Sequence, residues 1–392
     1  MVSYLVPVLA TLVGISAAAP SPLQPEIASQ SGQINSSTVD TFETRNGPAA
    51  LAAAYSKFGI QVPPSLLKAI DSQASKRGLP NYNHNQLAFG VGLGSGGQGL
   101  NLVFDTASAD LWVFSTETDP NATNGHNLYN PGGSSSAARL QGATWNVTYP
   151  DGTSASGDVY SDSVYFGGLS VQRQGVEAAV AVSPYFANAR MDGVLGLAFS
   201  TRNTVSPQKQ RTWFENAQST LQNPVFGADF RPNGYSYAYF GRIPSNFGNG
   251  YVASVDAAEG LWKFQSGSST GGSFPAIVDT ATSLILANNA VVTAYYKQIQ
   301  GANFNQALGG WVFNCNTRPP AFTFTVGTGY ISVPSAYMVY AQADQQQCYG
   351  SLQANGGLPY TVLGSPAIWS SYVILNLGNT GNPSVVWTQK VY

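Results

Sequence analysis

The chain has 392 residues, of which 43% are hydrophobic and only 9% are charged, and its formal net charge is −2. This length suggests two or three domains with a large core. The small net charge and the lack of basic clusters argue against nucleic-acid binding. Abundant Gly, Ser, Thr and Asn with few charges are typical of an extracellular, β-rich protein rather than a helical bundle.

The N-terminus carries an apolar stretch at residues 4–15, followed by the small residues 16–19. This pattern predicts a signal peptide over 1–19, cleaved after Ala18 or Ala19, with the Met1 amino group as its positive charge. No other segment is long and apolar enough to cross a membrane. We therefore expect a secreted, extracellular protein with no membrane association.

Residues 20–77 are rich in Ser, Gln, Ala and Pro, with one helical patch at 47–60, and they end at the dibasic pair Lys76-Arg77. A dibasic pair in a secreted precursor is a plausible processing site, because the strand-rich pattern begins just after it. The alternative is an exposed basic pair in a loop. The sequence thus predicts a pro-segment over 20–77.

Downstream of residue 78 the chain is dominated by strand patterns. Alternating apolar and polar residues predict strands at 86–93, 100–104, 143–149 and 158–166, with a hairpin turn at 94–99. Helical patterns are brief, at 206–221 and 288–300. We predict an all-β architecture with a few short helices and two lobes, 78–250 and 251–392, which meet at the Gly/Asn-rich stretch 246–250.

Two segments of the chain match each other. Residues 103–115 and 276–287 each place Asp-Thr-Ala after an apolar run, and an apolar pair with a glycine follows each at a similar distance, at 194–196 and 362–364. A lone Asp after a strand is usually a turn former. The recurrence instead predicts a duplicated half-site, with Asp105 and Asp279 as its carboxylates, on two similar lobes.

Other chemistries find little support. Only His84 and His126 are present, both in polar, loop-like surroundings, which weakens a Ser-His-Asp triad or a His-ligated zinc site. Cys315 and Cys348 are most simply one disulfide, with two free thiols as the alternative. Carboxylate chemistry remains, without a metal or cofactor.

These motifs give the chain a resemblance to a known family. The two Asp segments make the chain similar to the pepsin-like aspartic proteases, and within them to the secreted fungal enzymes. The resemblance extends to residues 148–164, 191–200 and 203–214. The resemblance implies a bilobal pepsin-like fold and a monomeric endopeptidase that hydrolyses polypeptides at acidic pH. A water activated between Asp105 and Asp279 would attack the peptide, expected between large apolar residues, and pepstatin-like inhibitors would bind there.

The chain departs from the family at two positions. The family signature is Asp-Thr-Gly, whereas Ala107 and Ala281 replace both glycines. A catalytically impaired pepsin-fold binding protein is therefore the alternative function. A carbohydrate-binding protein, a third class, would explain the aromatic residues but not the paired segments.

The resemblance also implies supporting roles. Thr106 and Thr280 would lock the two loops together, and Ser108 and Thr282 would bond the outer carboxylate oxygens; the alternative is ordinary turn hydroxyls. A flap would close over substrate, with Asp151 accepting a Lys before the cut. The residues assigned to this flap and its hydrogen-bonding partner are Tyr149, Asp151, Gly152 and Trp112.

The resemblance further makes the pro-segment a partner of the mature protein. Pro-segments of this family block the cleft with a Lys at the carboxylates, and Lys57 matches that position best. The alternative is a solvated helix residue. Asn121 and Asn146 are candidate glycosylation acceptors, each in an Asn-X-Thr triplet.

Overall fold

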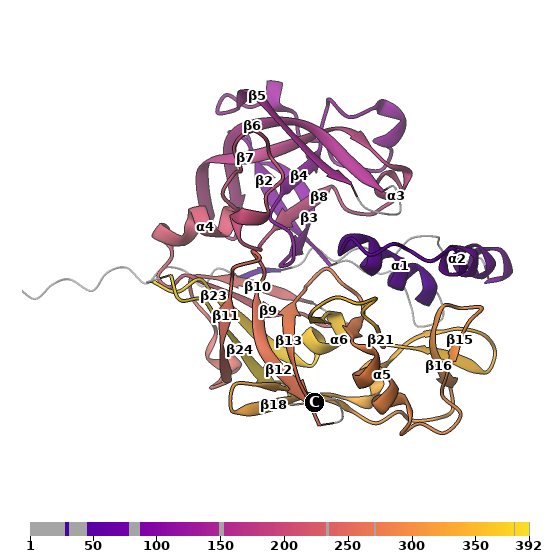
Figure 1. The fold of residues 1–392 in the computed structure, drawn as a ribbon. Coiled ribbons are helices and arrows are strands. Elements are labelled where there is room, and N and C mark those ends of the chain that lie inside the picture. The colour runs from indigo at the N-terminus through magenta and orange to yellow at the C-terminus, as the bar shows by residue number, and fades with distance from the viewer. Residues whose placement is uncertain are drawn as a thin grey trace, which may run out of the picture.

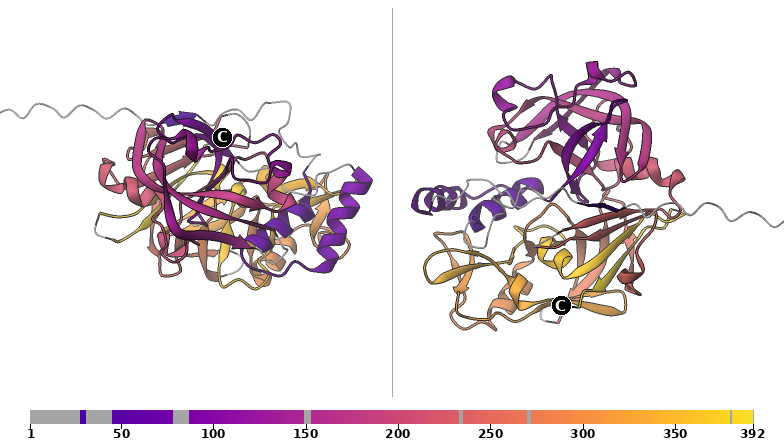
Figure 2. Two further views of the ribbon diagram at one scale, coloured as in Figure 1. Left: turned by 90° about the horizontal axis from the view of Figure 1, so that it is seen from above. Right: turned by 180° about the vertical axis from the view of Figure 1, so that it is seen from behind.

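The computed structural model describes residues 28–30, 45–77, 87–148, 153–232, 235–269, 272–379 and 381–391. Two β-rich lobes lie one above the other, and the helices α1 (Gly47–Lys57) and α2 (Pro64–Arg77) lie together on one side between them (Figures 1 and 2). This confirms the prediction of an all-β, bilobal fold with short helices. The expected signal peptide lies outside the described residues. Within the described part, no helix has the length and apolarity needed to span a membrane.

The N-terminal lobe is built on one sheet whose described strands run in the order β2-β3-β8-β4-β7-β6-β5. A further pairing of β2 with β6 curls the sheet toward closure. The predicted hairpin turn at 94–99 is confirmed, because β2 and β3 pair antiparallel on either side of it. The strands are β2 (Ala88–Leu93), β3 (Gln98–Asp105), β4 (Leu111–Phe114), β5 (Ala138–Thr148), β6 (Ser154–Phe166), β7 (Leu169–Val182) and β8 (Gly193–Gly196).

The C-terminal lobe contains a second large sheet and a small one, β15-β16-β20-β19. The strands that belong to this lobe are β11 (Tyr251–Asp256), β12 (Lys263–Ser268), β13 (Gly272–Val278), β14 (Ile285–Ala287), β15 (Asn303–Asn305), β16 (Gly310–Asn314), β17 (Phe322–Val326), β18 (Gly329–Val333), β19 (Val339–Gln342), β20 (Gln347–Gly350), β21 (Leu352–Ala354), β22 (Thr361–Leu363), β23 (Ser371–Asn376) and β24 (Ser384–Gln389).

The large sheet joins the two lobes. Strands β9 (Val225–Asp229) and β10 (Tyr237–Phe240) precede the expected lobe boundary at 246–250, yet β9 pairs with β23 near the C-terminus. On the other side of β10 lies β1 (Ala28–Gln30), from the expected pro-segment. Aromatic side chains from both lobes pack beside this sheet, so the lobes share a hydrophobic core.

The helices differ from the sequence prediction in three places. The expected helix at 206–221 is wrong over its first half: α4 is confined to Trp213–Ala217 and continues as a 3-10 turn at Gln218–Thr220. Pro207 cannot donate a helical hydrogen bond, and Thr212 forms a capping box with Glu215, so the helix begins after Thr212. The helix expected at 288–300 is α5 (Asn289–Tyr296), with Asn288 as its N-cap.

The third difference is α2, which the sequence analysis did not predict. Its buried residues are Leu66, Ala69, Ile70 and Gln73, which follow the spacing of one helix face. Because most residues of the segment are polar, its composition did not indicate a helix with an apolar face. Lys76 and Arg77 are the last two residues of α2. The two other short helices are α3 (Pro184–Ala187) and α6 (Ser365–Trp369).

The duplicated motif folds into the same local unit in each lobe. In the N-terminal lobe β3 pairs parallel with β8, which pairs antiparallel with β4. In the C-terminal lobe β13, β22 and β14 repeat this arrangement. A Cβ on Gly196 would lie 2.6 Å from the backbone of Ala109, and one on Gly364 would lie 2.2 Å from the carbonyl oxygen of Leu284. Glycine follows each apolar pair because the Asp-containing loop passes against its backbone there.

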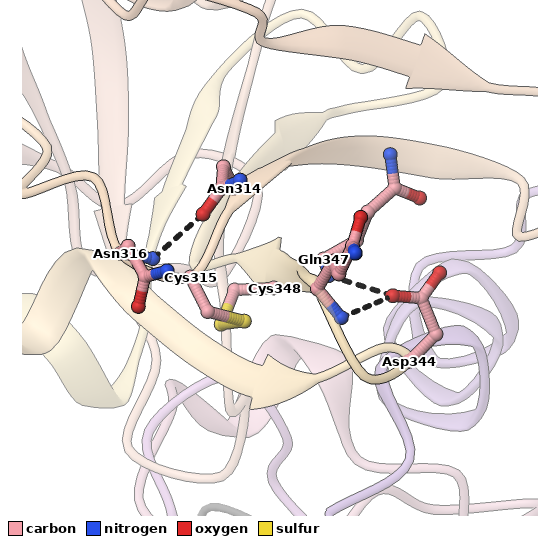
Figure 3. The surroundings of a disulfide bond; sticks show 7 residues. Asn314, Cys315, Asn316, Asp344, Gln347 and Cys348 are labelled. Carbon is pink, nitrogen blue, oxygen red and sulfur yellow. Dashed lines mark hydrogen bonds between the residues drawn. A yellow bond between two sulfur atoms is a disulfide. The ribbon is translucent and has the colours of Figure 1, made fainter.

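The predicted disulfide is confirmed. Cys315 and Cys348 are bonded, with 5.0 Å between their Cα atoms, next to the pairing of β16 with β20 (Figure 3). Asp344 accepts hydrogen bonds from the backbone of Gln346 and Gln347 and fixes the turn before Cys348. The bond closes a 33-residue interval and restricts the unfolded chain.

Candidate active site

Asp105 and Asp279 lie at the ends of equivalent strands, β3 and β13, where the two lobes meet. The inner oxygen of each carboxylate, Oδ1, accepts a hydrogen bond of 2.9 Å from the backbone N–H two residues later, at Ala107 or Ala281. The outer oxygen of Asp105 accepts from the Ser108 hydroxyl at 2.8 Å. The outer oxygen of Asp279 accepts from Thr282 at 2.5 Å. Both carboxylates are thus held by matching sets of donors.

Thr106 and Thr280 tie the two loops to each other. The backbone N–H of each donates to the side-chain oxygen of the other at 3.1 Å. Their hydroxyl groups donate onward across the interface, Thr106 to the carbonyl oxygen of Val278 at 2.8 Å and Thr280 to that of Phe104 at 2.5 Å. This reciprocal, buried set of bonds fixes one carboxylate relative to the other.

Lys57, at the end of α1, reaches into the site. Its Nζ lies 2.8 Å from Oδ1 of Asp105 and 2.7 Å from Oδ1 of Asp279. The inner oxygens of the two carboxylates therefore face one small volume, which the ammonium group fills. The solvated position that the sequence left open for Lys57 is wrong, since its side chain is only 16% exposed.

The charged groups in this volume shift one another's pKa values. Burial alone would lower the pKa of Lys57, but the attraction of Asp105 and Asp279 outweighs it, and the pKa is raised. Burial would raise the pKa of Asp105, but the charge and hydrogen bond of Lys57 lower it. For Asp279, which is fully buried, burial and the charge of Asp105 outweigh Lys57 and raise the pKa. One carboxylate is thus stabilised as an anion and the other binds a proton more readily.

Comparison with known proteins matches this geometry. The family model described as eukaryotic aspartyl protease matches residues 86–382. The chain belongs to this family. It is 37% identical to aspergillopepsin-1 of Aspergillus oryzae over 383 residues, which cover 95% of this chain and 96% of the relative. It is 39% identical to penicillopepsin-2 of Penicillium janthinellum (84% and 85% covered) and 37% identical to endothiapepsin of Cryphonectria parasitica (86% and 85%). This aspartyl protease is an aspartic endopeptidase with fungal relatives.

A cavity of about 80 Å³ opens beside Asp105 and Lys57. Its remaining lining is mainly apolar, and Trp112 stands between the cavity and the core, 5.9 Å from the ring of Trp145 and 5.1 Å from that of Phe186. The apolar lining residues are Val103, Trp112, Val147, Phe186, Met191, Val194 and Ala281. The cavity therefore places an apolar surface next to Asp105.

The two alanines of the motifs fit the protease fold without strain. Each keeps the N–H that donates to its carboxylate, and neither has a positive φ. Ala107 packs among apolar residues of the C-terminal lobe and of α1 and α2. Ala281 packs among those of the N-terminal lobe. Each extra methyl group is therefore buried against the opposite lobe.

Some predicted site residues cannot be placed. Tyr149, Asp151 and Gly152 lie outside the described residues, so the flap and the hydrogen bond expected between Tyr149 and Trp112 remain predictions. The candidate glycosylation residues are both exposed, Asn121 in a 3-10 turn and Asn146 on β5. Their occupancy remains a prediction. The described residues form no group of three or more His, Cys, Asp or Glu that could hold a metal ion.

A buried carboxyl pair near the site was not predicted. Asp110 lines the cavity and Glu177 is fully buried behind it. The side-chain amide of Asn203 donates to both, at 2.9 and 2.8 Å. Burial raises the pKa of Asp110 to about 6, and burial with the nearby charge of Asp110 raises that of Glu177 well above its ordinary value. The sequence signal for this pair is Glu177, the single acidic residue within the apolar run at 175–182.

This pair predicts a loss of stability toward neutral pH. Because both folded-state pKa values are raised, the stabilising contribution of the pair is complete below about pH 4 and is lost as the pH rises through 6 and beyond. Glu177→Gln should raise the unfolding temperature at pH 7 by at least about 2 °C and leave it nearly unchanged at pH 4. The measurement is calorimetry of the full-length chain at both pH values. Glu259→Gln, at an exposed position, is the control, and equal shifts at both pH values would contradict the raised pKa values of the pair.

Proposed function

We propose that this chain is the precursor of a secreted acid endopeptidase in which Asp105 and Asp279 activate a water molecule. The observation that supports this most directly is that their inner oxygens face one volume, in which a single Nζ bonds both. Once Lys57 leaves, a water molecule can form the same two hydrogen bonds. Two carboxyl groups this close titrate as a pair that keeps one proton over the acidic range.

The reaction follows from one shared proton. The ionised carboxylate accepts a proton from the water, whose oxygen attacks the carbonyl carbon of the peptide, while the protonated carboxyl donates to the carbonyl oxygen. When the tetrahedral intermediate collapses, the C–N bond breaks and the leaving nitrogen takes a proton from the pair. Ser108 and Thr282 hold the outer oxygens, so the inner oxygens stay aimed at the water. The reaction needs no cofactor and no covalent intermediate.

The substrates we propose are polypeptides with a large apolar residue beside the cut. The cavity next to Asp105 has the apolar walls that such a side chain requires. Pepstatin-like inhibitors would bind at the same carboxylates. Acceptance of Lys through Asp151 belongs to this proposal and rests on the sequence resemblance alone.

Residues 20–77 act, in this proposal, as a pro-segment that keeps the precursor inactive. Lys57 occupies the place of the water, and α1 and α2 bury an apolar surface against the C-terminal lobe. Cleavage after Lys76-Arg77, followed by release of the segment, would yield a monomeric mature enzyme. Acid favours release, because protonation of Asp105 removes its attraction for Lys57.

The second candidate function is a pepsin-fold binding protein whose chemistry is impaired by Ala107 and Ala281. The extra methyl groups at the base of the cleft favour it. The intact hydrogen bonds from both alanine N–H groups to the carboxylates favour the enzyme.

The first prediction concerns the two carboxylates. Asp105→Asn and Asp279→Asn should each lower kcat by at least about a thousandfold, since one carboxyl group cannot supply both base and acid. The assay is hydrolysis of denatured haemoglobin at acidic pH, with pepstatin as inhibitor. Asp256→Asn, at an exposed position on β11, should leave kcat unchanged. Activity above a few per cent in either site variant would refute the dyad.

The second prediction concerns Lys57. In a precursor protected by Lys76→Ala and Arg77→Ala, Lys57→Gln should speed the appearance of activity at pH 5 by at least about tenfold, because breaking a buried ion pair costs ~3–5 kcal/mol. The pKa of Asp105 is lowered in the precursor, so its ion pair with Lys57 stabilises the precursor above the ordinary carboxyl pKa near 4. This stabilisation is lost as the pH falls below that value. Lys68→Gln, exposed on α2, is the matched control. An unchanged rate in the Lys57 variant would refute the inhibitory role.

The third prediction separates the two candidate functions. The double change Ala107→Gly and Ala281→Gly should alter kcat/KM by no more than about tenfold between pH 2 and 7, because the N–H donors are already in place. A parent protein without turnover or pepstatin binding, rescued by the double change, would instead establish the binding-protein function.

A further inference from the structure

His126 lies in an environment that the sequence analysis did not expect. The backbone at His126 lies outside the helices and strands, as its polar neighbours predicted, but its side chain is only 2% exposed. The imidazole ring stacks on Phe114 of β4, with 3.8 Å between ring centroids and 9° between the ring planes. Its two ring nitrogens contact Ala187 and Met191, which lie 61 and 65 residues further along the chain. Tertiary packing therefore buries this ring.

Both ring nitrogens of His126 face acceptors that cannot donate. Nδ1 lies 2.9 Å from the carbonyl oxygen of Met191, and Nε2 lies 3.1 Å from that of Ala187. A carbonyl oxygen only accepts hydrogen bonds, so each nitrogen must carry a proton for both bonds to exist. A neutral imidazole carries one proton and a charged imidazole carries two. Only the charged ring can donate both hydrogen bonds at once.

A carboxylate balances this charge. Oδ1 of Asp192 lies 3.9 Å from Nδ1 of His126. Asp192 also accepts from the backbone of Asn101 and from the backbone and side chain of Asn127, at 2.7 to 2.9 Å. Among the described residues, Asp192 is the acid with an oxygen within 4.0 Å of a ring nitrogen, while β4 contributes Phe114 and α3 contributes a backbone carbonyl. The imidazolium thus has a fixed counter-ion within a nearly closed pocket.

The segment that His126 holds forms one wall of the cavity beside Asp105. Phe186, next to Ala187, and Met191 both line that cavity. Two hydrogen bonds from one ring fasten both ends of the connection from α3 to Met191. Asp105 itself is held separately by Ala107 and Ser108. A loss of these bonds would therefore disturb the apolar wall more than the carboxylate.

We propose that His126 is a positioning residue that, as a doubly protonated imidazolium, fastens the 187–191 segment and thereby shapes the apolar cavity that binds the substrate side chain beside Asp105. This inference rests on the proposed function for its kinetic consequence, whereas the charge of the ring can be measured without any activity. A ring that carried a single proton could donate only one of the two carbonyl bonds, which would loosen the wall.

The first arm of the test measures the ring directly. The full-length precursor, labelled with ¹⁵N-histidine, is studied by NMR at pH 4.5, with His84→Gln used to assign the two rings. We expect protons on both nitrogens of His126 and slow exchange of both with water. A neutral ring at pH 4.5, or fast exchange of both protons, would overturn the proposal even if the enzyme is fully active.

The second arm measures catalysis by the acid-activated protein. His126→Phe keeps the stacking on Phe114 but has no donors, so KM for a peptide with a large apolar residue at the cut should rise about tenfold while kcat changes little. His126→Gln can donate to one of the two carbonyl oxygens at a time and should recover part of the loss, without dependence on ring charge. His84→Gln should behave like the parent.

The two arms distinguish a failure of the proposed function from a failure of the role proposed for His126. An inactive parent with a charged His126 ring would contradict the proposed function and leave the charge assignment standing. An active His126→Phe variant with unchanged KM and an unchanged preference for large over small apolar residues would overturn the positioning role. If His126→Phe does not fold, the NMR result and the KM of His126→Gln decide.

Discussion

The structure depends on keeping two carboxyl groups close together and out of water. Burying one charge is costly, and burying two like charges side by side is more so, unless donors and an opposite charge compensate. Here the compensation comes from four hydrogen bonds within the Asp-containing loops and from Lys57. When Lys57 is removed, a proton must take its place as the balancing charge. In the function that we propose, the same constraint connects an inactive precursor with activity at acidic pH.

The two-fold repetition of the lobes meets this constraint by using the same set of groups twice. Each half supplies one carboxylate, one hydroxyl donor and one threonine that bonds across the interface. Because Thr106 and Thr280 exchange hydrogen bonds directly, the two loops are held in one arrangement relative to each other. The shared sheet and the methyl groups of Ala107 and Ala281, buried against opposite lobes, add further contacts between the halves. The cleft is therefore fixed at its base by contacts from both lobes.

Buried protons recur in the N-terminal lobe around this base. Asp110 and Glu177 are stabilised by holding a proton, and the ring of His126 has acceptors for two. Both features border the cavity that opens beside Asp105. The raised pKa values of Asp110 and Glu177 place the loss of stability toward neutral pH beside this cavity, whereas the disulfide between Cys315 and Cys348 cross-links the C-terminal lobe.

The sequence by itself determined the fold class, the two Asp segments and the disulfide, because these are local patterns: period-two strands, a repeated motif and a single pair of cysteines. It also pointed to Lys57 but could not choose between a buried and a solvated side chain. What only the tertiary structure decided are contacts between residues far apart in the chain. The stripe of α2 finds its partner surface in the C-terminal lobe, β9 pairs with β23, and His126 meets carbonyl groups more than 60 residues away. Burial of a polar residue depends on such distant neighbours, which the local composition around His126 and Glu177 does not reveal.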